Sequence, residues 1–346
     1  MEQSHSAGRP GNGGDGGAGR WQSPRRSTAS MSLTRVAANR VWASVPIIVV
    51  VTLVVFSIPY FIPGDPALTI AGPNATVQDV ERIRTDLGFD EPLVGQYLGW
   101  LSRSLRFDLG QSYIIGRDVG TMIAERMEVT LSLALLSTAF AALVGVPLGI
   151  AAAVRIGSVR DRVAVVGASL GVAIPNYWLA AVLVTYLAVK LRWFPAAGYV
   201  RIGEDVVQWA RHLVLPTVSL GAIAAAEITR QMRGRLAETL ALDYVRTARM
   251  KGLPAHLIIG KHALKNAAIP VVTALGLQLT IVLGGSVIVE QIFGMAGLGE
   301  LAITAVQARD IPVIQGIVLL TTVVAIGANL VVDIITSYLD PRVSIS

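Results

Sequence analysis

The sequence predicts an all-α membrane protein with six transmembrane helices. Apolar residues make up 53% of its 346 positions and charged residues only 15%, whereas soluble domains carry roughly 25% charged residues. Six apolar stretches are long enough to cross a hydrocarbon core of ~30 Å, which takes about 20 helical residues. They do not alternate polar and apolar residues as membrane β-strands do. An ordinary soluble enzyme is excluded, because too little charge remains to cover its surface.

The chain begins with a segment, residues 1–30, that is rich in Gly, Ser and Arg. Such a composition cannot bury a core, so we predict that this extension is disordered. Met31 is a second candidate start, since a short basic lead with Arg35 and Arg40 then enters the first apolar stretch. That stretch, residues 41–62, has no Ala-x-Ala cleavage site, and we interpret it as a retained helix rather than a signal peptide.

Five further apolar stretches complete a predicted membrane domain over residues 31–346. The six predicted spans are residues 41–62, 129–154, 163–189, 213–229, 271–289 and 311–339. Glu227 lies near the end of the fourth span, and Arg230 follows it by three residues, which predicts an ion pair on one helix face. For Asp333, near the end of the sixth span, we expect a boundary or helix-packing role rather than a substrate site.

The positions of the charges predict which side of the membrane each loop faces. With the N-terminus in the cytoplasm, the inner segments carry a net charge of +12 and the outer segments −4. Because Lys and Arg concentrate in cytoplasmic loops, both termini are predicted to be cytoplasmic. Together with the two acids inside the spans, Glu227 and Asp333, these charges add up to the formal net charge of +6. Nucleic-acid binding is not expected, since no aromatic-basic motif accompanies the charge.

The loop between the first two spans, residues 63–128, is too long to be a simple connector. Thr76 and Asp79 have the spacing of a helix N-terminal cap, and Gly88 is placed to end that helix. A second short helix is expected over residues 92–106. Its Leu93, Tyr97, Trp100 and Leu101 lie on one side. We therefore predict a small external subdomain, which either packs on the helix ends or binds a partner.

The longest cytoplasmic loop, which includes residues 236–267, is strongly basic. Its pattern predicts a helix over residues 238–250, a stop at Gly252 and a second helix from Pro254 to about Asn266. A helix–Gly–helix unit of this kind is suited to docking into a groove of another protein. A solvated basic loop near lipid headgroups is the alternative, and the residues alone favour neither.

Motifs for chemistry within the chain itself are missing. The sequence has no cysteine, which excludes disulfides and Cys-based metal sites. It contains no G-x-x-x-x-G-K-[ST] phosphate loop and no G-x-S-x-G or H-E-x-x-H motif. His256 and His262 are six residues apart, which does not align them on one helix face. The glycine cluster at residues 294–299 predicts a tight turn or re-entrant bend. Energy for active transport would therefore come from a partner.

Several motifs together resemble the inner-membrane permease subunits of ABC importers for dipeptides, oligopeptides and nickel, and most strongly the dipeptide permease B type. The motifs are Phe61-Ile-Pro-Gly-Asp-Pro-Ala67, Leu87-Gly-Phe-Asp-Glu-Pro-Leu93, Phe107-Asp-Leu-Gly-Gln-Ser112, Asp243-Tyr-Val-Arg-Thr-Ala-Arg-Met-Lys-Gly252, Lys261-His-Ala-Leu-Lys-Asn-Ala267, Gly297-Leu-Gly299, Arg309-Asp-Ile-Pro-Val-Ile-Gln-Gly316 and Asp340-Pro-Arg342. The resemblance covers residues 31–346 and implies the type I importer fold.

The resemblance also implies a role for the basic cytoplasmic loop. In such permeases this loop carries the EAA motif, whose coupling helix sits in a groove on the ATP-binding subunit. Arg246-Thr247-Ala248 fall at the Glu-Ala-Ala positions and Gly252 at the motif's glycine, so Arg246 departs from the general pattern. The implied coupling residues are Asp243, Tyr244, Arg246, Thr247, Ala248, Lys251, Gly252, Leu253, His256 and His262.

The resemblance implies a transport subunit and not an enzyme, in the cytoplasmic membrane of a bacterium. The implied partners are a second homologous permease, two ATP-binding subunits (or one fused or duplicated ATPase), an extracytoplasmic substrate-binding lipoprotein and membrane lipid. No cofactor is expected in this chain, because the ATPase subunits would bind ATP and Mg. Di- or oligopeptides are the expected substrates, with nickel chelates, haem or another small solute as alternatives.

Transport in such a permease would follow alternating access between inward- and outward-facing states. Three prolines near span ends or middles could permit helix bends: Pro147, Pro175 and Pro216. Three glycines could permit close helix packing: Gly276, Gly284 and Gly285. An ion-coupled secondary transporter is the rival from another class, and it would require an intramembrane charge relay and inverted repeats.

Overall fold

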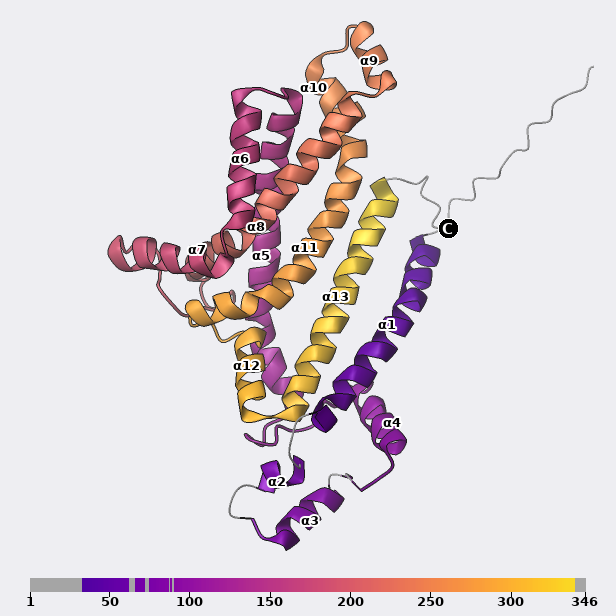
Figure 1. Cartoon of the computed structure of the whole chain (residues 1–346), viewed down its shortest axis with the longest axis vertical. Helices are drawn as coiled ribbons and strands as arrows, with labels where there is room; N and C mark the ends of the chain where they lie inside the picture. The colour runs from indigo at the N-terminus through magenta and orange to yellow at the C-terminus, as the bar shows by residue number, and fades with distance from the viewer. Residues whose placement is uncertain (1–32, 62–65, 72–74, 87, 89, 340–346) are drawn as a thin grey trace, which may run out of the picture.

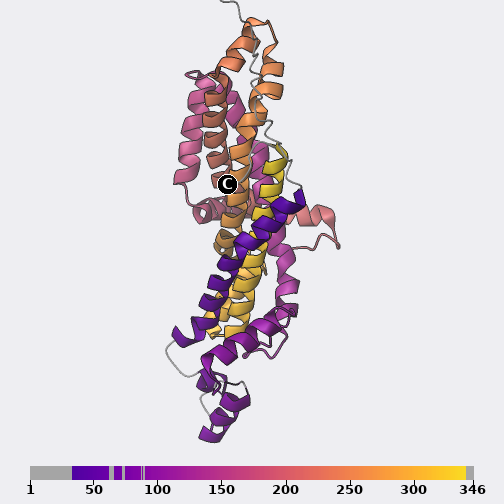
Figure 2. The ribbon, with the colours of Figure 1, turned by 90° about the vertical axis from the view of Figure 1, so that its right-hand side faces the viewer.

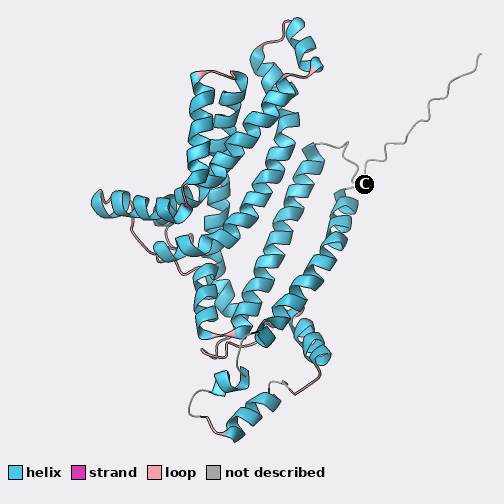
Figure 3. Cartoon of the chain, viewed as in Figure 1, coloured by secondary structure: helices cyan, strands magenta, loops and turns pink. Residues whose placement is uncertain are grey.

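The computed structural model describes residues 33–61, 66–71, 75–86, 88 and 90–339. All regular elements in this part of the chain are helices (Figure 3), and an isolated bridge joins Gln111 to Asp118. The predicted all-α class is therefore confirmed. The extension 1–30, the alternative start at Met31 and the Asp340-Pro-Arg342 motif lie outside the described residues.

Within the described residues, four helices are long and apolar enough to cross a membrane. They are α5 (Val119–Val154), α8 (Val206–Leu240), the helix over Ala255–Ile292 that ends in α11 (Leu264–Ile292), and α13 (Ile311–Leu339). The first predicted span corresponds to α1 (Leu33–Phe61), which has a shorter apolar part, Trp42–Ile58. α1 packs along α13 on one side of the bundle (Figures 1 and 2).

The third predicted span, residues 163–189, is broken, and the break lies at Pro175, one of the prolines expected to permit a bend. The region forms α6 (Val159–Ala173), α7 (Asn176–Leu183) and a π-helical continuation of α7, η1 (Val184–Lys190), with a bend of 96° between α6 and the α7–η1 pair. Pro175 lacks an N–H and disfavours helical backbone in the residue before it, and Ile174 is extended with ψ of 120°. α7 consequently runs sideways out of the bundle (Figure 1). Pro147 and Pro216, by contrast, lie inside the continuous helices α5 and α8.

Helices α5 and α8 pack together at the centre of the bundle, and two glycines on α5 allow them to approach closely. A Cβ atom added to Gly145 would lie 2.7 Å from the carbonyl oxygen of Ala225. A Cβ atom added to Gly149 would lie 2.7 Å from the carbonyl oxygen of Thr229. Distances under 3.0 Å force the backbones apart, so only glycine fits at these two positions.

The three glycines predicted to permit close packing differ from one another. Gly276 of α11 faces Val332 of α13 so closely that a Cβ atom would overlap the valine side chain. Gly284 and Gly285 have no described atom of this chain within 4 Å of an added Cβ. The prediction is therefore confirmed for Gly276, and close packing within the chain is not found at the other two.

The loops predicted to face opposite sides of the membrane lie at opposite ends of the molecule (Figure 1). One end holds α2 (Pro66–Ala71), α3 (Val77–Asp86) and α4 (Leu93–Ser104), and the other holds α9 (Asp243–Met250). α3 begins with the predicted cap, because the Asp79 carboxylate accepts a hydrogen bond from the Thr76 N–H at 3.0 Å. Hydrogen bonds from Thr76 hold the pKa of Asp79 below its ordinary value.

Helix α4 joins α1 to the subdomain that was predicted to be external. The rings of Tyr97 and Trp100 lie 5.4 and 6.0 Å from the ring of Phe56, and the Tyr97 hydroxyl hydrogen-bonds Thr52 at 3.0 Å. Leu93 was expected on the same side, but it is 56% exposed. The packed side of α4 is thus the aromatic one, and the subdomain between α1 and α5 rests on the first helix.

The carboxylate of Asp161 ties the start of α6 to α8. It accepts hydrogen bonds from the Gly157 N–H at 2.8 Å and from the guanidinium of Arg233, where the Nη2 contact measures 3.0 Å. The Asp161 side chain is buried, and that of Arg233 is 31% exposed. Glu227, further along α8, pairs with Arg230 as predicted.

Replacement of Asp161 by alanine is expected to lower the thermal unfolding midpoint of the purified protein. It removes a buried carboxylate and leaves the partly buried guanidinium of Arg233 without its acceptor, and breaking such a pair costs more than losing a surface pair. Glu238→Ala is the matched control, since its pair with Arg235 is exposed on both sides and worth at most about 1 kcal/mol. Equal midpoint shifts in the two variants would contradict a role for Asp161 in fixing α6.

Candidate functional site

The basic loop that was predicted to be cytoplasmic folds as a helical hairpin beyond the ends of α8 and α11 (Figure 1). Its second arm consists of α10 (Ala255–Leu257) and the π-helical segment η2 (Ile258–Ala263). Val245 and Ala248 of α9 are buried against Ile258, with Leu240 at the end of α8 completing this small core. The loop is therefore a packed unit, and its shape is set by apolar contacts inside the hairpin.

The helix boundaries in the hairpin differ from those predicted. The single helix expected over residues 238–250 is broken, because α8 ends at Leu240 and α9 begins at Asp243, with Leu242 extended at ψ of 149°. The second helix does not end near Asn266, because η2 continues without interruption into α11. The break lets α9 fold back so that its apolar face meets η2, a contact that periodicity along the sequence does not reveal.

Gly252 ends α9, as predicted. Its φ of +77° is a left-handed conformation that costs other residues about 1–2 kcal/mol. The Gly252 N–H donates to the carbonyl of Arg249 at 2.9 Å, and the Leu253 N–H donates to that of Ala248 at 3.3 Å. This pair of bonds is a Schellman motif. Pro254 follows as the cap of α10, one residue before the first turn in which it was expected.

Tyr244 joins the two arms of the hairpin from the outside. Its hydroxyl donates to the backbone carbonyl of His262 at 3.2 Å and accepts from the side-chain amide of Asn266 at 3.0 Å. Two motifs that are separate in the sequence, those around Asp243 and Lys261, are therefore brought together.

The remaining predicted coupling residues lie on the exposed part of the hairpin. We call the turn and its flanking residues, 246–261, the hairpin tip. Three apolar side chains are exposed there, namely Met250 at 88%, Leu253 at 37% and Leu257 at 42%. They alternate with the exposed basic or weakly basic residues Arg246, Arg249, Lys251, His256 and Lys261. Thr247 donates to the Asp243 carbonyl at 2.9 Å. The tip thus presents an apolar patch surrounded by positive charge.

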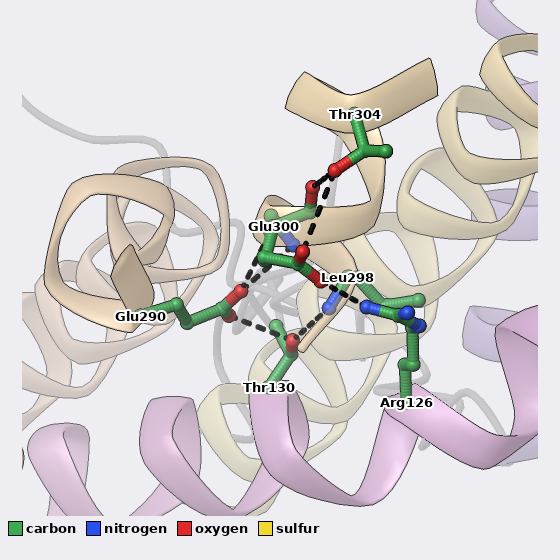
Figure 4. A network of polar contacts seen from close by, with 7 residues as sticks. Arg126, Thr130, Glu290, Leu298, Glu300 and Thr304 are labelled. Carbon is green, nitrogen blue, oxygen red and sulfur yellow. Dashed lines mark hydrogen bonds and ion pairs between the residues drawn. The ribbon is translucent and has the colours of Figure 1, made fainter. Parts of the chain in front are cut away.

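Glu290 lies at the opposite end of α11 and is not among the predicted site residues (Figure 4). This carboxylate is fully buried. One oxygen, Oε1, accepts hydrogen bonds from the hydroxyls of Thr130 at 2.8 Å and Ser286 at 3.0 Å. The other, Oε2, accepts from the N–H groups of Gly299 at 2.8 Å and Glu300 at 3.2 Å. Glu290 therefore caps the N-terminus of α12 (Leu298–Ala308), a helix whose own N-cap residue is a glycine.

The two glycines of the Gly297-Leu-Gly299 motif leave the space that this cap occupies. A Cβ atom on Gly297 would lie 2.5 Å from the Glu290 carboxyl group, and one on Gly299 would lie 2.6 Å from Val287 Cα. The glycine cluster forms the tight turn that was predicted, and α12 folds back beside α11 and α5. An ion pair between Arg126 of α5 and Glu300 attaches α12 a second time (Figure 4).

Two other motifs converge at the start of α13. The buried Asp310 carboxylate accepts hydrogen bonds from the Ser112 hydroxyl and, at 3.1 Å, from the Tyr113 N–H. The Gln315 side chain donates to the Val55 carbonyl of α1 at 3.3 Å. The motifs that begin at Phe107 and Arg309 are thus one structural unit, which fixes the external loop to the last helix.

These features together define a polytopic membrane permease: a helical bundle with a basic, packed hairpin at one end and a capped, folded-back helix at the other. The chain belongs to the family described as binding-protein-dependent transport system inner membrane component, which it matches over residues 145–345. Residues 33–134 match the N-terminal family of the same membrane components. The chain is accordingly a permease subunit of an ABC importer and not an enzyme.

Comparison with known proteins supports this assignment. A putative peptide transport system permease protein of Brucella abortus is 40% identical over 311 residues, which is 90% of this chain and 99% of the relative. The glutathione transport system permease protein GsiC of Escherichia coli K12 is 38% identical over 88% of this chain and 97% of its own length. An inward-facing structure of the MetNI methionine ABC transporter matches with a TM-score of 0.51 at 19% identity, covering 63% of this chain and 96% of that chain. That likeness supports the type I importer fold alone.

Proposed function

We propose that this permease imports short peptides across the cytoplasmic membrane of a bacterium by alternating access. The support comes from the relatives, which are named for peptide transport and for transport of glutathione, itself a tripeptide. Nothing in the described residues favours nickel chelates or haem, since no group of three or more metal-ligating acids or histidines lies together among them. The N- and C-termini are proposed to lie in the cytoplasm, on the evidence of the charge distribution.

The hairpin tip is proposed to dock on a separate ATP-binding subunit. This docking rests on one observation: η2 runs without a break into α11, so the helix over Ala255–Ile292 is continuous from the tip to the opposite end of the bundle. A partner that binds Leu253 and Leu257 can therefore move the whole helix over Ala255–Ile292, which is long enough to cross the membrane. The exposed Lys and Arg residues fit an acidic rim around an apolar groove.

The other partners follow from the same proposal. Energy comes from ATP, which the ATPase subunits bind together with Mg, since the sequence has no phosphate loop. A second, homologous permease completes the translocation path, and an extracytoplasmic substrate-binding lipoprotein delivers the peptide to the outer face. The subdomain of α2, α3 and α4, at the opposite end of the molecule from the hairpin (Figure 1), is the docking surface proposed for that protein.

The rival function, ion-coupled secondary transport, requires a titratable relay inside the membrane. Glu290 is the fully buried acid in the described spans, and its oxygens are occupied by two hydroxyls and two backbone N–H groups. Its surroundings are those of a helix cap. Glu227 is paired with Arg230. Neither acid therefore favours a proton pathway.

Substitution of Gly252 by aspartate tests the docking proposal. We expect peptide uptake to fall at least tenfold and the ATPase subunits to be lost on purification, while the permease still inserts in the membrane. The added Cβ meets no atom within 4 Å, and aspartate is one of the residues that adopt the left-handed conformation, so the effect arises from a negative charge in a basic tip. Gly252→Asn is the matched control, because asparagine tolerates this backbone without the charge. Unchanged uptake in the aspartate variant would count against docking at this hairpin.

A further inference from the structure

A long apolar groove lies between α5, α6 and α8 and plays no part in the function proposed above. Its volume is about 770 Å³. α5 contributes Val144 and Leu148 to its lining, α6 contributes Val163 and Gly167, and α8 contributes Ala222. Arg160 and Thr229 are the polar residues of the lining. The groove is thus lined almost entirely by apolar residues, and Arg160 is its one charged residue.

The length of the groove matches one leaflet of a bilayer. Along α6 it extends from Val159 to Gly171, a helical distance of about 18 Å at 1.5 Å per residue. Half of a ~30 Å hydrocarbon core is about 15 Å. The neighbouring α6 side chains Val163, Val166 and Leu170 are 57–66% exposed. The groove therefore opens beside an apolar ridge that belongs at membrane depth.

The side chain of Arg160 lies at the end of the groove where a lipid headgroup would lie. Arg160 and Arg162 are both in the first turn of α6, next to the short loop that carries Arg155. The acid of this segment, Asp161, is engaged by Arg233 of α8. Among the described residues, no carboxylate forms an ion pair with Arg160 or Arg155, so the end of the groove keeps a net positive charge.

We propose that this groove binds an anionic phospholipid of the cytoplasmic leaflet, with an acyl chain in the groove and the phosphate on Arg160. Charge and shape both favour this occupant: an arginine at one end recognises a phosphate, and an all-apolar channel of one-leaflet length accommodates an acyl chain. A helix of a second permease could cover the same face, but it would bury Arg160 unless it also supplied an acid. The leaflet assignment rests on the membrane orientation given under the proposed function.

Lipid titration of the full-length protein, followed by native mass spectrometry, tests the site. The wild type should bind its first phosphatidylglycerol at least tenfold more tightly than phosphatidylcholine. Arg160→Gln should reduce that preference severalfold, because the phosphatidylglycerol headgroup keeps the net negative charge that choline cancels in phosphatidylcholine, and the arginine is the cation that recognises this charge. Gly167→Leu should weaken both lipids, because its side chain enters the groove, where an added Cβ meets no atom within 4 Å.

A matched control comes from α13. Gly327→Leu also adds a side chain where nothing lies within 4 Å, but Gly327 does not line the groove, so its lipid binding should equal that of the wild type. Unchanged phosphatidylglycerol binding in both Arg160→Gln and Gly167→Leu would overturn the proposal.

Because the sequence has no native cysteine, single introduced cysteines allow two further experiments. A disulfide-length cross-link from Gly167→Cys to a co-expressed second permease would assign the groove to that subunit and overturn the lipid site. Labelling of Arg160→Cys by an impermeant maleimide from the outside of cells would overturn the orientation in the proposed function, whereas the lipid titration would still report on the groove itself.

Discussion

Replacement of Glu290 by alanine should lower the free energy of unfolding by about 3–5 kcal/mol and abolish transport. The substitution removes the acceptor for two N–H groups at the start of α12 and for the hydroxyls of Thr130 and Ser286. Each buried polar group left without a partner costs about 1–3 kcal/mol, and the cap itself contributes about 1 kcal/mol. Three of the four groups belong to the buried residues Thr130, Ser286 and Gly299, whereas Glu300 lies at a pocket that Glu290 also lines. Thermal or denaturant unfolding in detergent measures the stability, and uptake in proteoliposomes or cells measures the transport.

Glu290→Gln separates hydrogen bonding from charge. A glutamine has the same shape, and its carbonyl oxygen can accept from the two N–H groups of α12 while its amide donates to Thr130 and Ser286, whose hydroxyls can turn to accept. We expect a loss of about 1 kcal/mol. Glu300→Gln is a control for the neighbouring ion pair, which is partly exposed and worth about 1 kcal/mol or less. If the glutamine variant at position 290 is as unstable as the alanine variant, the negative charge of Glu290 stabilises the position of α12, and the hydrogen bonds of the cap alone do not.

Replacement of Gly149 by alanine should destabilise the protein by about 1–3 kcal/mol, the usual cost of overpacking a close contact. The added Cβ lies 2.7 Å from both the Thr229 carbonyl oxygen and Met232 Cβ. α5 and α8 must therefore separate, and every contact along the central helix pair is weakened. Gly145→Ala acts at the same interface, so the double variant should lose more than either single one. The unfolding midpoint in detergent is the measurement.

Gly284→Ala and Gly285→Ala are the matched controls, because both glycines lie inside α11 with no atom within 4 Å of an added Cβ. An alanine there should be neutral or slightly stabilising, since alanine favours helix over glycine by up to about 1 kcal/mol. A Gly149→Ala variant as stable as Gly284→Ala would mean that α5 and α8 do not approach as closely as described. A strong loss in the two α11 variants would instead point to a contact with another subunit.

Much of the membrane domain could be predicted from single stretches of sequence. The helix at residues 311–339 has the predicted bounds, and the stretches at residues 129–154, 213–229 and 271–289 are the apolar parts of longer helices. Hydrocarbon length and composition determine such elements locally. The helix caps at Thr76 and Gly252 are equally local, because each depends on residues within a few positions.

The candidate site was predicted less completely, for physical reasons. Hydropathy does not distinguish a straight span from a bent one, so the sequence marks Pro175 as one of three possible bends but does not show that the chain turns by 96° there and not at Pro147 or Pro216. The fold of the hairpin depends on Val245 meeting Ile258 across a turn. Glu290 directly follows the predicted span 271–289 and falls in a predicted outer segment. The signal that could identify it is an acid at the end of a long apolar stretch, followed closely by Gly297 and Gly299.

The sequence by itself determined that this is a helical membrane protein, which stretches cross the bilayer, and that its basic hairpin is suited to a partner. These properties depend on composition and on periodicity within one element. Only the tertiary structure decided how α12 is capped by Glu290, why Gly145 and Gly149 must be glycine, and where α5, α6 and α8 leave an apolar groove. Those properties depend on distances between residues far apart in the chain, and such distances exist only once the helices have packed.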